Sequence, residues 1–177
     1  MIFRKLTFVA LAASLLAAAG AADAGRAPPV GIQSFAQLAT PLPYPYDEAA
    51  NADRAVAAAR AVALAHHKLL LIDLGGNWCG DCRILSSTME LPSLKPWVAA
   101  HYQVVLVDVG RFDKNLQIPA RYGITSRLEG VPALLIIDPR TSRLLDAGHI
   151  AALADARSMT PQALADWLAQ WTGAPHP

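Results

Sequence analysis

Residues 69–82 read LLLIDLGGNWCGDC and contain both cysteines of this 177-residue chain, Cys79 and Cys82. The apolar run that opens the stretch predicts a buried strand, and the glycines and asparagine at 75–77 predict a turn. We expect a helix to begin at Cys79, because its unpaired N–H groups and the positive end of its dipole stabilise a thiolate there. Cys79 is then the attacking thiol, and Cys82, one turn deeper, is the resolving thiol.

Two thiols with this spacing can close a disulfide and exchange electrons with another protein through a mixed disulfide. Zinc is one alternative, but a structural zinc site takes four ligands and the chain has no second cysteine pair. A purely structural disulfide is another, although so short a loop gains little chain entropy. The pattern favours redox exchange, which requires at least one sulfur to meet solvent at the helix tip.

The beginning of the chain has the pattern of a secretory signal peptide. Arg4 and Lys5 precede an apolar stretch at 6–19, and the small residues that follow end in ADA at 22–24. A membrane anchor is the alternative, but the apolar run is shorter than the ~20 residues that span a bilayer. We therefore expect residues 1–24 to be cleaved and the protein to be exported, most simply to a bacterial periplasm.

The remaining sequence has the length of one domain. Five prolines at 25–46 predict an extended leader, more simply a passive tether than a docking segment, before a domain at 47–172 and a tail at 173–177. The formal net charge is +1 and no basic run is present, which argues against nucleic acid or acidic lipid as the main partner.

Helical and extended patterns alternate along this domain. Helices are expected at 47–67, 79–90, 116–122 and 161–171, and strands at 69–74, 104–109, 131–137 and 143–148. Thr160 is expected to cap the last helix, with Pro161 in its first turn. The order indicates an α/β fold in which helices cover a central sheet.

Residues 73–82, followed by YGI at 122–124 and GVP at 130–132, resemble the thioredoxin superfamily in residue types and order. The likeness is closest to exported thioredoxin-like domains, including the periplasmic carboxy-terminal domain of the thiol:disulfide interchange protein. It implies a thioredoxin fold, with a central mixed β-sheet flanked by helices and an additional N-terminal helix.

The resemblance also implies two substrate-binding positions. In the family a cis proline before a strand lies against the disulfide, which corresponds to Pro132, and Val131 would offer its backbone to an extended substrate segment. X–Pro bonds are the ones that tolerate the cis form. Without the family, Pro132 would be an ordinary strand-initiating proline.

Asp73 and Trp78 complete the candidate site. Asp73 is a carboxylate in an apolar strand, and burial raises the pKa of such a group toward the range in which it passes protons near neutral pH. The resemblance implies proton transfer with Cys82; a hydrogen-bonded structural aspartate is the alternative. Trp78 is expected to shield the motif and contact substrate, or else to be an ordinary core aromatic.

Two features depart from the family pattern. Asp81 stands where proline is often found, and a negative charge beside a forming thiolate opposes it, which predicts a more reducing pair than that of a strong oxidase. Residues 125–129 form a longer stretch than in a minimal thioredoxin. They would lie beside the active site, either selecting partners or as a tolerated loop extension.

We predict an exported thiol-disulfide oxidoreductase, reductant rather than oxidant, that acts on cysteine-containing exported proteins and is reduced by a membrane electron donor. No organic cofactor and no metal are expected. One alternative is a periplasmic copper carrier, because Cu(I) favours thiolates and the chain has five histidines, although these show no ligand spacing. The other is a redox-inert thioredoxin-like adaptor that binds partners in the groove beside Pro132.

Overall fold

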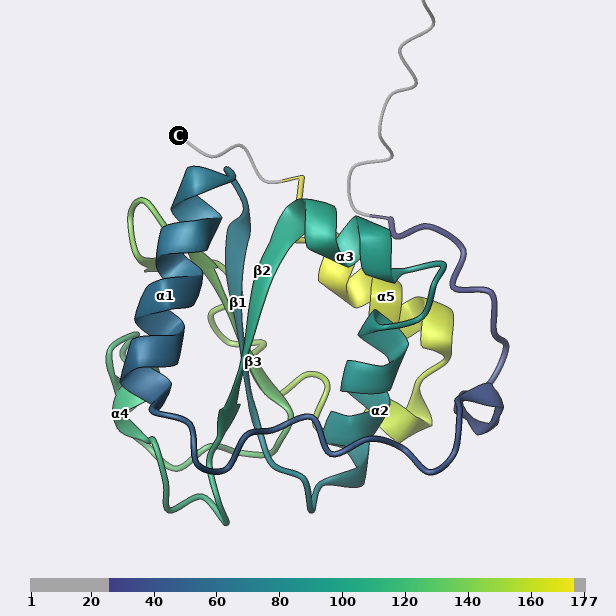
Figure 1. Cartoon of the computed structure of the whole chain (residues 1–177), viewed down its shortest axis with the longest axis horizontal. Coiled ribbons are helices and arrows are strands. Elements are labelled where there is room, and N and C mark those ends of the chain that lie inside the picture. Colours follow the sequence, from purple (N-terminus) through teal and green to yellow (C-terminus); the bar gives the residue numbers. More distant parts are fainter. Residues whose placement is uncertain (1–25, 174–177) are drawn as a thin grey trace, which may run out of the picture.

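The computed structural model describes residues 26–173, so the predicted signal peptide at 1–24 lies outside the described residues, as does the predicted tail after residue 173. Its centre is a four-stranded sheet in the order β2-β1-β3-β4 (Figure 1). The strands are β1 (Leu69–Gly75), β2 (Tyr102–Asp108), β3 (Ala133–Asp138) and β4 (Arg143–Leu144). β1 is parallel to β2 and antiparallel to β3, which confirms the mixed sheet.

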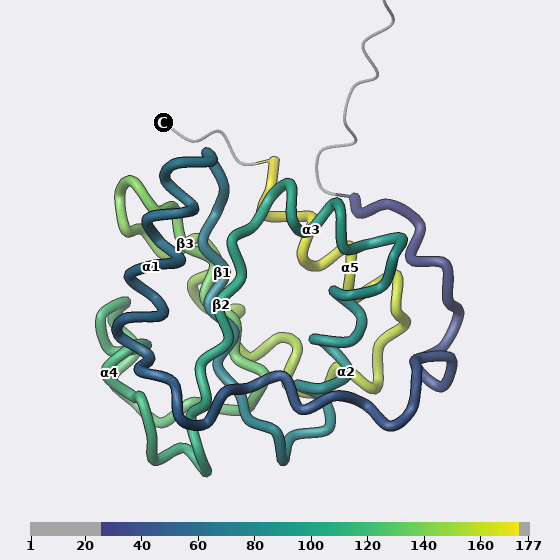
Figure 2. Tube along the Cα trace, viewed as in Figure 1, coloured from purple at the N-terminus to yellow at the C-terminus, as the bar shows by residue number. Residues whose placement is uncertain are grey.

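Helices cover both faces of this sheet, as Figures 1 and 2 show. One face carries α1 (Ala52–Ala65) and α4 (Gln117–Ala120); the other carries α2 (Gly80–Met89), α3 (Lys95–His101) and α5 (Pro161–Ala169). Side chains alternate along a strand, so Ile72 of β1 packs in the core beneath α1, whereas Leu71 packs beneath α2 and α5. Asp73 and Gly75 continue the Leu71 side, which places them toward α2.

Side-chain caps set the helix boundaries. The Asn51 side chain accepts the N–H of Arg54, so α1 begins five residues later than the predicted helix at 47–67. The Thr160 hydroxyl accepts the N–H of Ala163 at the start of α5, which confirms the predicted cap.

Within the described part of the chain, no helix has the length and apolarity needed to cross a bilayer.

Beyond such shifts of boundaries, one helix was missed and one strand is much shorter than predicted. α3 was not predicted, and it leads directly into β2 at Tyr102. The strand predicted at 143–148 ends at Leu144, because Asp146 turns inward and its Oδ1 accepts the N–H of Ile136 at 2.9 Å. The buried N–H of Ile136 thus donates to the Asp146 carboxylate instead of to the backbone of a longer β4.

The leader is extended, but the prediction that it is a passive tether is wrong. Val30, Leu38 and Tyr46 are buried, and the N–H of Val30 donates to the side chain of Gln162 on α5 at 3.0 Å. Figure 1 shows the segment running past α5 and α2 before it reaches α1. Its buried side chains lie far apart along the segment and reach separate parts of the core. The proline content of the leader alone did not indicate whether the segment packs.

Replacing Val30 tests this packing. Val30→Ala should lower the free energy of unfolding by about 2 kcal/mol, because two buried methyl groups are lost and a small cavity remains. Urea denaturation of the purified protein measures the loss. Gln33→Ala, at an exposed position of the same segment, is the matched control. Equal stability of the two variants would contradict the packing.

Candidate active site

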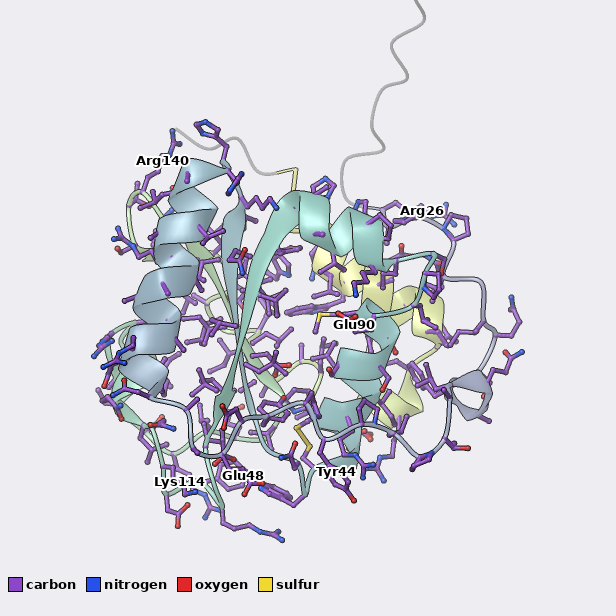
Figure 3. The ribbon with its side chains drawn as sticks, in the orientation of Figure 1. Arg26, Tyr44, Glu48, Glu90, Lys114 and Arg140 are labelled. Carbon is purple, nitrogen blue, oxygen red and sulfur yellow. A yellow bond between two sulfur atoms is a disulfide. The ribbon has the colours of Figure 1, made fainter. Side chains whose placement is uncertain are left out.

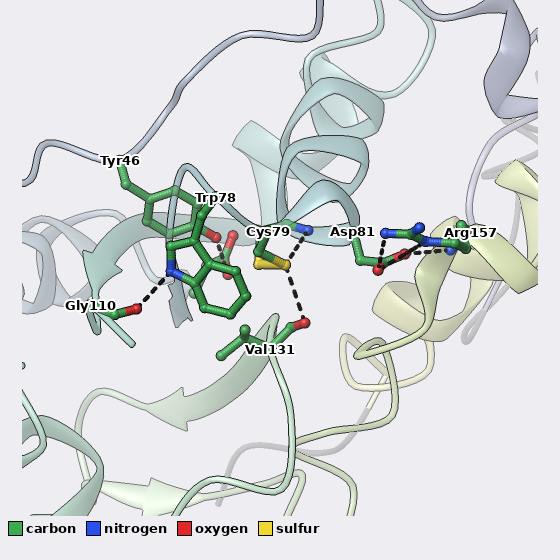
Figure 4. The surroundings of a disulfide bond; sticks show 9 residues. Tyr46, Trp78, Cys79, Asp81, Gly110, Val131 and Arg157 are labelled. Carbon is green, nitrogen blue, oxygen red and sulfur yellow. Dashed lines mark hydrogen bonds and ion pairs between the residues drawn. A yellow bond between two sulfur atoms is a disulfide. The ribbon is translucent and has the colours of Figure 1, made fainter. Parts of the chain in front are cut away.

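The cysteine pair lies at the tip of α2. Cys79 is the N-cap residue, its Sγ accepts the N–H of Cys82 at 3.1 Å, and the two residues form a disulfide with their Cα atoms 5.3 Å apart (Figure 4). Cys79 keeps 5% of its surface exposed and Cys82 none. Cys79 is therefore the more accessible of the two residues, as predicted, but both are buried in the oxidised protein, so the expected exposure of a sulfur at the helix tip is small at most.

The segment before β3 closes over Cys79. The Val131–Pro132 peptide bond is cis, and the carbonyl oxygen of Val131 lies 3.3 Å from Cys79 Sγ. In the reduced protein a Cys79 thiol at this distance would donate to that oxygen. The structure thus brings Val131 and Pro132 to Cys79, the more accessible cysteine, where the resemblance placed them.

Asp73 lies at the centre of β1 with no exposed surface, between Leu106 on β2 and Leu134 on β3. The hydroxyl of Tyr46 donates to its Oδ1 at 2.9 Å, and its Oδ2 is buried without a hydrogen-bond partner among residues 26–173. Burial raises the pKa of Asp73 to about 7, although the hydrogen bond from Tyr46 acts in the opposite direction. The carboxyl group can therefore gain or lose a proton near neutral pH.

Gly75 leaves room for Tyr46 and Cys82 on the side of β1 that carries Asp73. A Cβ atom at Gly75 would overlap the hydroxyl of Tyr46 and lie 2.8 Å from Cys82 Sγ. Both atoms therefore press against the same side of β1, the side that carries Asp73. Sequence reasoning missed Tyr46, because nothing local distinguishes it from Tyr44, which is 70% exposed where Tyr46 is 3% exposed.

Trp78 is a surface residue and not a core aromatic, since it is 41% exposed. Its Nε1 donates to the carbonyl of Gly110 at 2.7 Å, the Arg111 guanidinium lies 4.3 Å from its ring centroid, and Phe112 meets it edge-on. These contacts hold the indole in one orientation beside Cys79. Arg127 lies over the ring of Phe112, so the predicted 125–129 segment contacts the same aromatic cluster.

Asp81 is paired with Arg157, a residue that sequence reasoning did not find. Asp81 Oδ2 lies 2.7 Å from Arg157 Nη2, and Oδ1 accepts both the Nε and the backbone N–H of Arg157 at 2.9 Å (Figure 4). Burial raises the pKa of Asp81, but these hydrogen bonds and the positive charge of Arg157 outweigh it and hold the pKa below its usual value. The guanidinium thus offsets much of the charge that Asp81 places beside Cys79.

Two of the histidines in the described residues contribute to packing, whereas His66 and His67 are exposed. His101 Nδ1 lies 2.8 Å from the carbonyl oxygen of Trp97, and the His149 ring lies against Trp171. Among residues 26–173, no group of three or more histidine, cysteine, aspartate and glutamate side chains is placed to hold a metal ion.

A disulfide at a helix tip, a cis proline beside it and a buried carboxyl group behind it define the class of thiol-disulfide oxidoreductases. The chain belongs to the thioredoxin-like family, whose model matches residues 50–139.

Two known proteins are similar to this chain. The crystal structure of a disulphide isomerase from Xylella fastidiosa Temecula1 superposes with a TM-score of 0.65 at 35% identity, covering 73% of this chain and 97% of that one. A thioredoxin from Haemophilus influenzae is 31% identical over 68 residues, which are 38% of this chain and 55% of the thioredoxin. The chain thus matches little more than half the length of this curated relative.

The raised pKa of Asp73 predicts a pH-dependent stability. The folded-state pKa of about 7 lies above the ordinary value of 3.8, so the folded protein loses stability as the pH rises through this window. Asp73→Asn removes that loss and should raise the free energy of unfolding by up to about 4 kcal/mol at pH 8 and by little at pH 4. Urea denaturation of the oxidised protein at several pH values measures it.

Asp138 provides the control, because it is a buried aspartate with the opposite shift. Burial raises the pKa of Asp138, but hydrogen bonds from the residues at 140 and 141 lower it below its usual value. Asp138→Asn should therefore destabilise the protein at neutral pH. A stability difference for Asp73→Asn that did not change with pH would contradict the assignment.

Proposed function

We propose that this protein is an exported thiol-disulfide oxidoreductase that reduces disulfides in cysteine-containing exported proteins. The observation that carries the proposal is the Cys79–Cys82 disulfide at the N-terminus of α2, in which Cys79 keeps a small exposed surface and Cys82 none. The similarity to a disulphide isomerase and to a thioredoxin supports the reaction class. Export is inferred from the signal-peptide pattern at 1–24.

The reaction begins with the reduced protein. The Cys79 thiolate attacks one sulfur of a substrate disulfide, and the other substrate sulfur leaves as a thiolate that takes up a proton. Cys82 then transfers its proton to the Asp73 carboxylate and attacks Cys79 Sγ, which releases the second substrate thiolate. The substrate gains two electrons, and the protein is left with the Cys79–Cys82 disulfide.

Trp78, Val131 and Pro132 are the residues we assign to substrate binding. The exposed indole of Trp78 and the backbone of Val131 both lie beside the Cys79–Cys82 disulfide (Figure 4). An extended peptide placed there can form main-chain hydrogen bonds beside Pro132, which has no N–H of its own.

The preference for reduction rests on the charges next to the pair. Arg157 offsets the charge of Asp81, whereas among residues 26–173 the hydrogen-bond partner of Asp73 is the neutral hydroxyl of Tyr46, which leaves the charge of an ionised Asp73 uncompensated. A carboxylate near the dithiol disfavours the thiolate form, and a reduced state with less thiolate stabilisation has a lower reduction potential. Each turnover leaves the protein oxidised, so a donor must return two electrons, and we propose a membrane electron donor for this step.

Turnover of a protein disulfide tests the proposal. The wild-type protein should accelerate the reduction of insulin by dithiothreitol, because Cys79 supplies the attacking sulfur. Cys79→Ser should be no faster than the uncatalysed reaction, and Cys82→Ser should accumulate a mixed disulfide. Equal rates for the wild type and Cys79→Ser would exclude catalysis through this pair and favour the adaptor alternative.

The reduction potential tests the direction. Equilibration with glutathione should give a value closer to about −270 mV, as in thioredoxin, than to the −120 mV or so of a strong oxidant. Arg157→Gln leaves the charge of Asp81 uncompensated and should lower the potential further, and adding Asp81→Asn should reverse that change. Arg143→Gln, exposed on β4, is the matched control. A wild-type potential near that of a strong oxidant would overturn the preference.

A further inference from the structure

The buried carboxyl group has a hydrogen-bond donor from outside the part of the chain that the family model matches. Tyr46 precedes the matched residues 50–139 and belongs to the leader, yet its hydroxyl donates to Asp73 Oδ1 at 2.9 Å. Tyr46 is 3% exposed and Asp73 is fully buried, so no bulk water competes for this contact. The leader therefore reaches the chemical centre of the domain.

The position of Tyr46 depends on the turn that carries Cys79. The N–H of Tyr46 donates to Asn77 Oδ1 at 3.0 Å, and Asn77 Nδ2 donates to the carbonyl of Tyr46 at 2.9 Å. Arg83 on α2 adds a second attachment, since its Nε donates to the carbonyl of Pro43 at 2.8 Å. The leader is thus held on both sides of the cysteine pair.

The two oxygens of Asp73 have different surroundings. Oδ1 accepts from Tyr46, whereas Oδ2 is buried and has no hydrogen-bond partner in the described part of the chain. Cys82 Sγ and the Tyr46 hydroxyl lie against the same side of Gly75. The donor therefore occupies one carboxyl oxygen and leaves the other available to the sulfur that must lose a proton.

We propose that Tyr46 is a positioning residue for the redox step: its hydroxyl holds the Asp73 carboxyl group so that Oδ2 exchanges a proton with Cys82, and the leader thereby sets the pH range of disulfide exchange. This inference rests on the proposed function. In the resolving step the Cys82 S–H bond breaks, its proton moves to Oδ2, and its electron pair forms the bond to Cys79 Sγ as the substrate sulfur leaves. Tyr46 keeps its own proton throughout.

The charged groups around the site are consistent with this division of roles. Tyr46 faces Asp73 and Asp108 at the end of β2, and burial together with both carboxylates raises its pKa above the usual range. Lys114 lies 3.4 Å from Asp108 and offsets its charge. Tyr46 therefore remains a neutral donor at working pH, and Asp73 and Cys82 are the groups that titrate.

Tyr46→Phe removes the donor while keeping the ring, and carboxyl ¹³C NMR of the oxidised protein gives the first readout. The cysteines do not titrate in that state, so the Asp73 inflection is observed alone. It should move upward by about half to one pH unit, because the lost hydrogen bond stabilised the carboxylate. Tyr44→Phe is the matched control, since Tyr44 lies at the molecular edge of the same leader and is 70% exposed (Figure 3). It should leave the inflection at the wild-type value.

The second readout is the attack of Cys82. When the reduced protein reacts with dithiobis(nitrobenzoate), the second released thionitrobenzoate reports the resolving step. In Tyr46→Phe this release should be about two- to fivefold slower at pH 7, because less Asp73 carboxylate is present, and close to the wild-type rate at pH 9. A merely structural role of Tyr46 would lower the rate at every pH.

An unchanged Asp73 inflection and an unchanged pH–rate profile in folded Tyr46→Phe would overturn the inference. If Tyr46→Phe does not fold, Asn77→Ala decides, because it frees the Tyr46 backbone but keeps the hydroxyl: an upward shift supports the inference, and no shift overturns it. The NMR titration does not require turnover. Failure of the proposed function appears separately, as insulin reduction that does not depend on Cys79.

Discussion

A carboxyl group held away from water beneath the cysteine pair imposes several requirements on the rest of this domain. Burying Asp73 in an apolar strand is costly unless the group is neutral or hydrogen-bonded, and the protein uses both means. Its pKa is raised to about 7, and Tyr46 donates to one of its oxygens. Because Tyr46 and Cys82 must approach the same side of β1, residue 75 has no room for a side chain.

The same constraint explains why the leader is part of the fold. A tyrosine that enters the core must bring its backbone with it, and the reciprocal hydrogen bonds with Asn77 satisfy the polar groups of that backbone. Val30 and Leu38 bury apolar surface earlier in the same segment. The leader thus contributes both to the stability of the domain and to the surroundings of its acid.

Near the surface of the site the carboxylate of Asp81 is paired with a positive charge, whereas the buried carboxyl group of Asp73 accepts from a neutral hydroxyl. Asp81 follows Cys79 by two residues, but Arg157 offsets its charge. The guanidinium and the backbone N–H of Arg157 donate to both carboxylate oxygens of Asp81. Beside them, Trp78 is held by Gly110 and Arg111 and keeps its indole partly exposed next to Cys79. The balance of charge at the pair therefore depends on Asp73 more than on the aspartate within the motif.

The sequence by itself determined the strand, turn and helix at 69–82, the cysteine pair at the helix tip and the cap at Thr160, because periodicity and capping act between residues a few positions apart. It also indicated the mixed sheet, through a family resemblance. Only the tertiary structure decided that Tyr46 reaches Asp73, 27 positions away, and that Arg157 reaches Asp81, 76 positions away. Such contacts leave no local pattern: Tyr44 and Tyr46 look alike in sequence, and only the packing of the leader against α2 and β1 buries one and exposes the other.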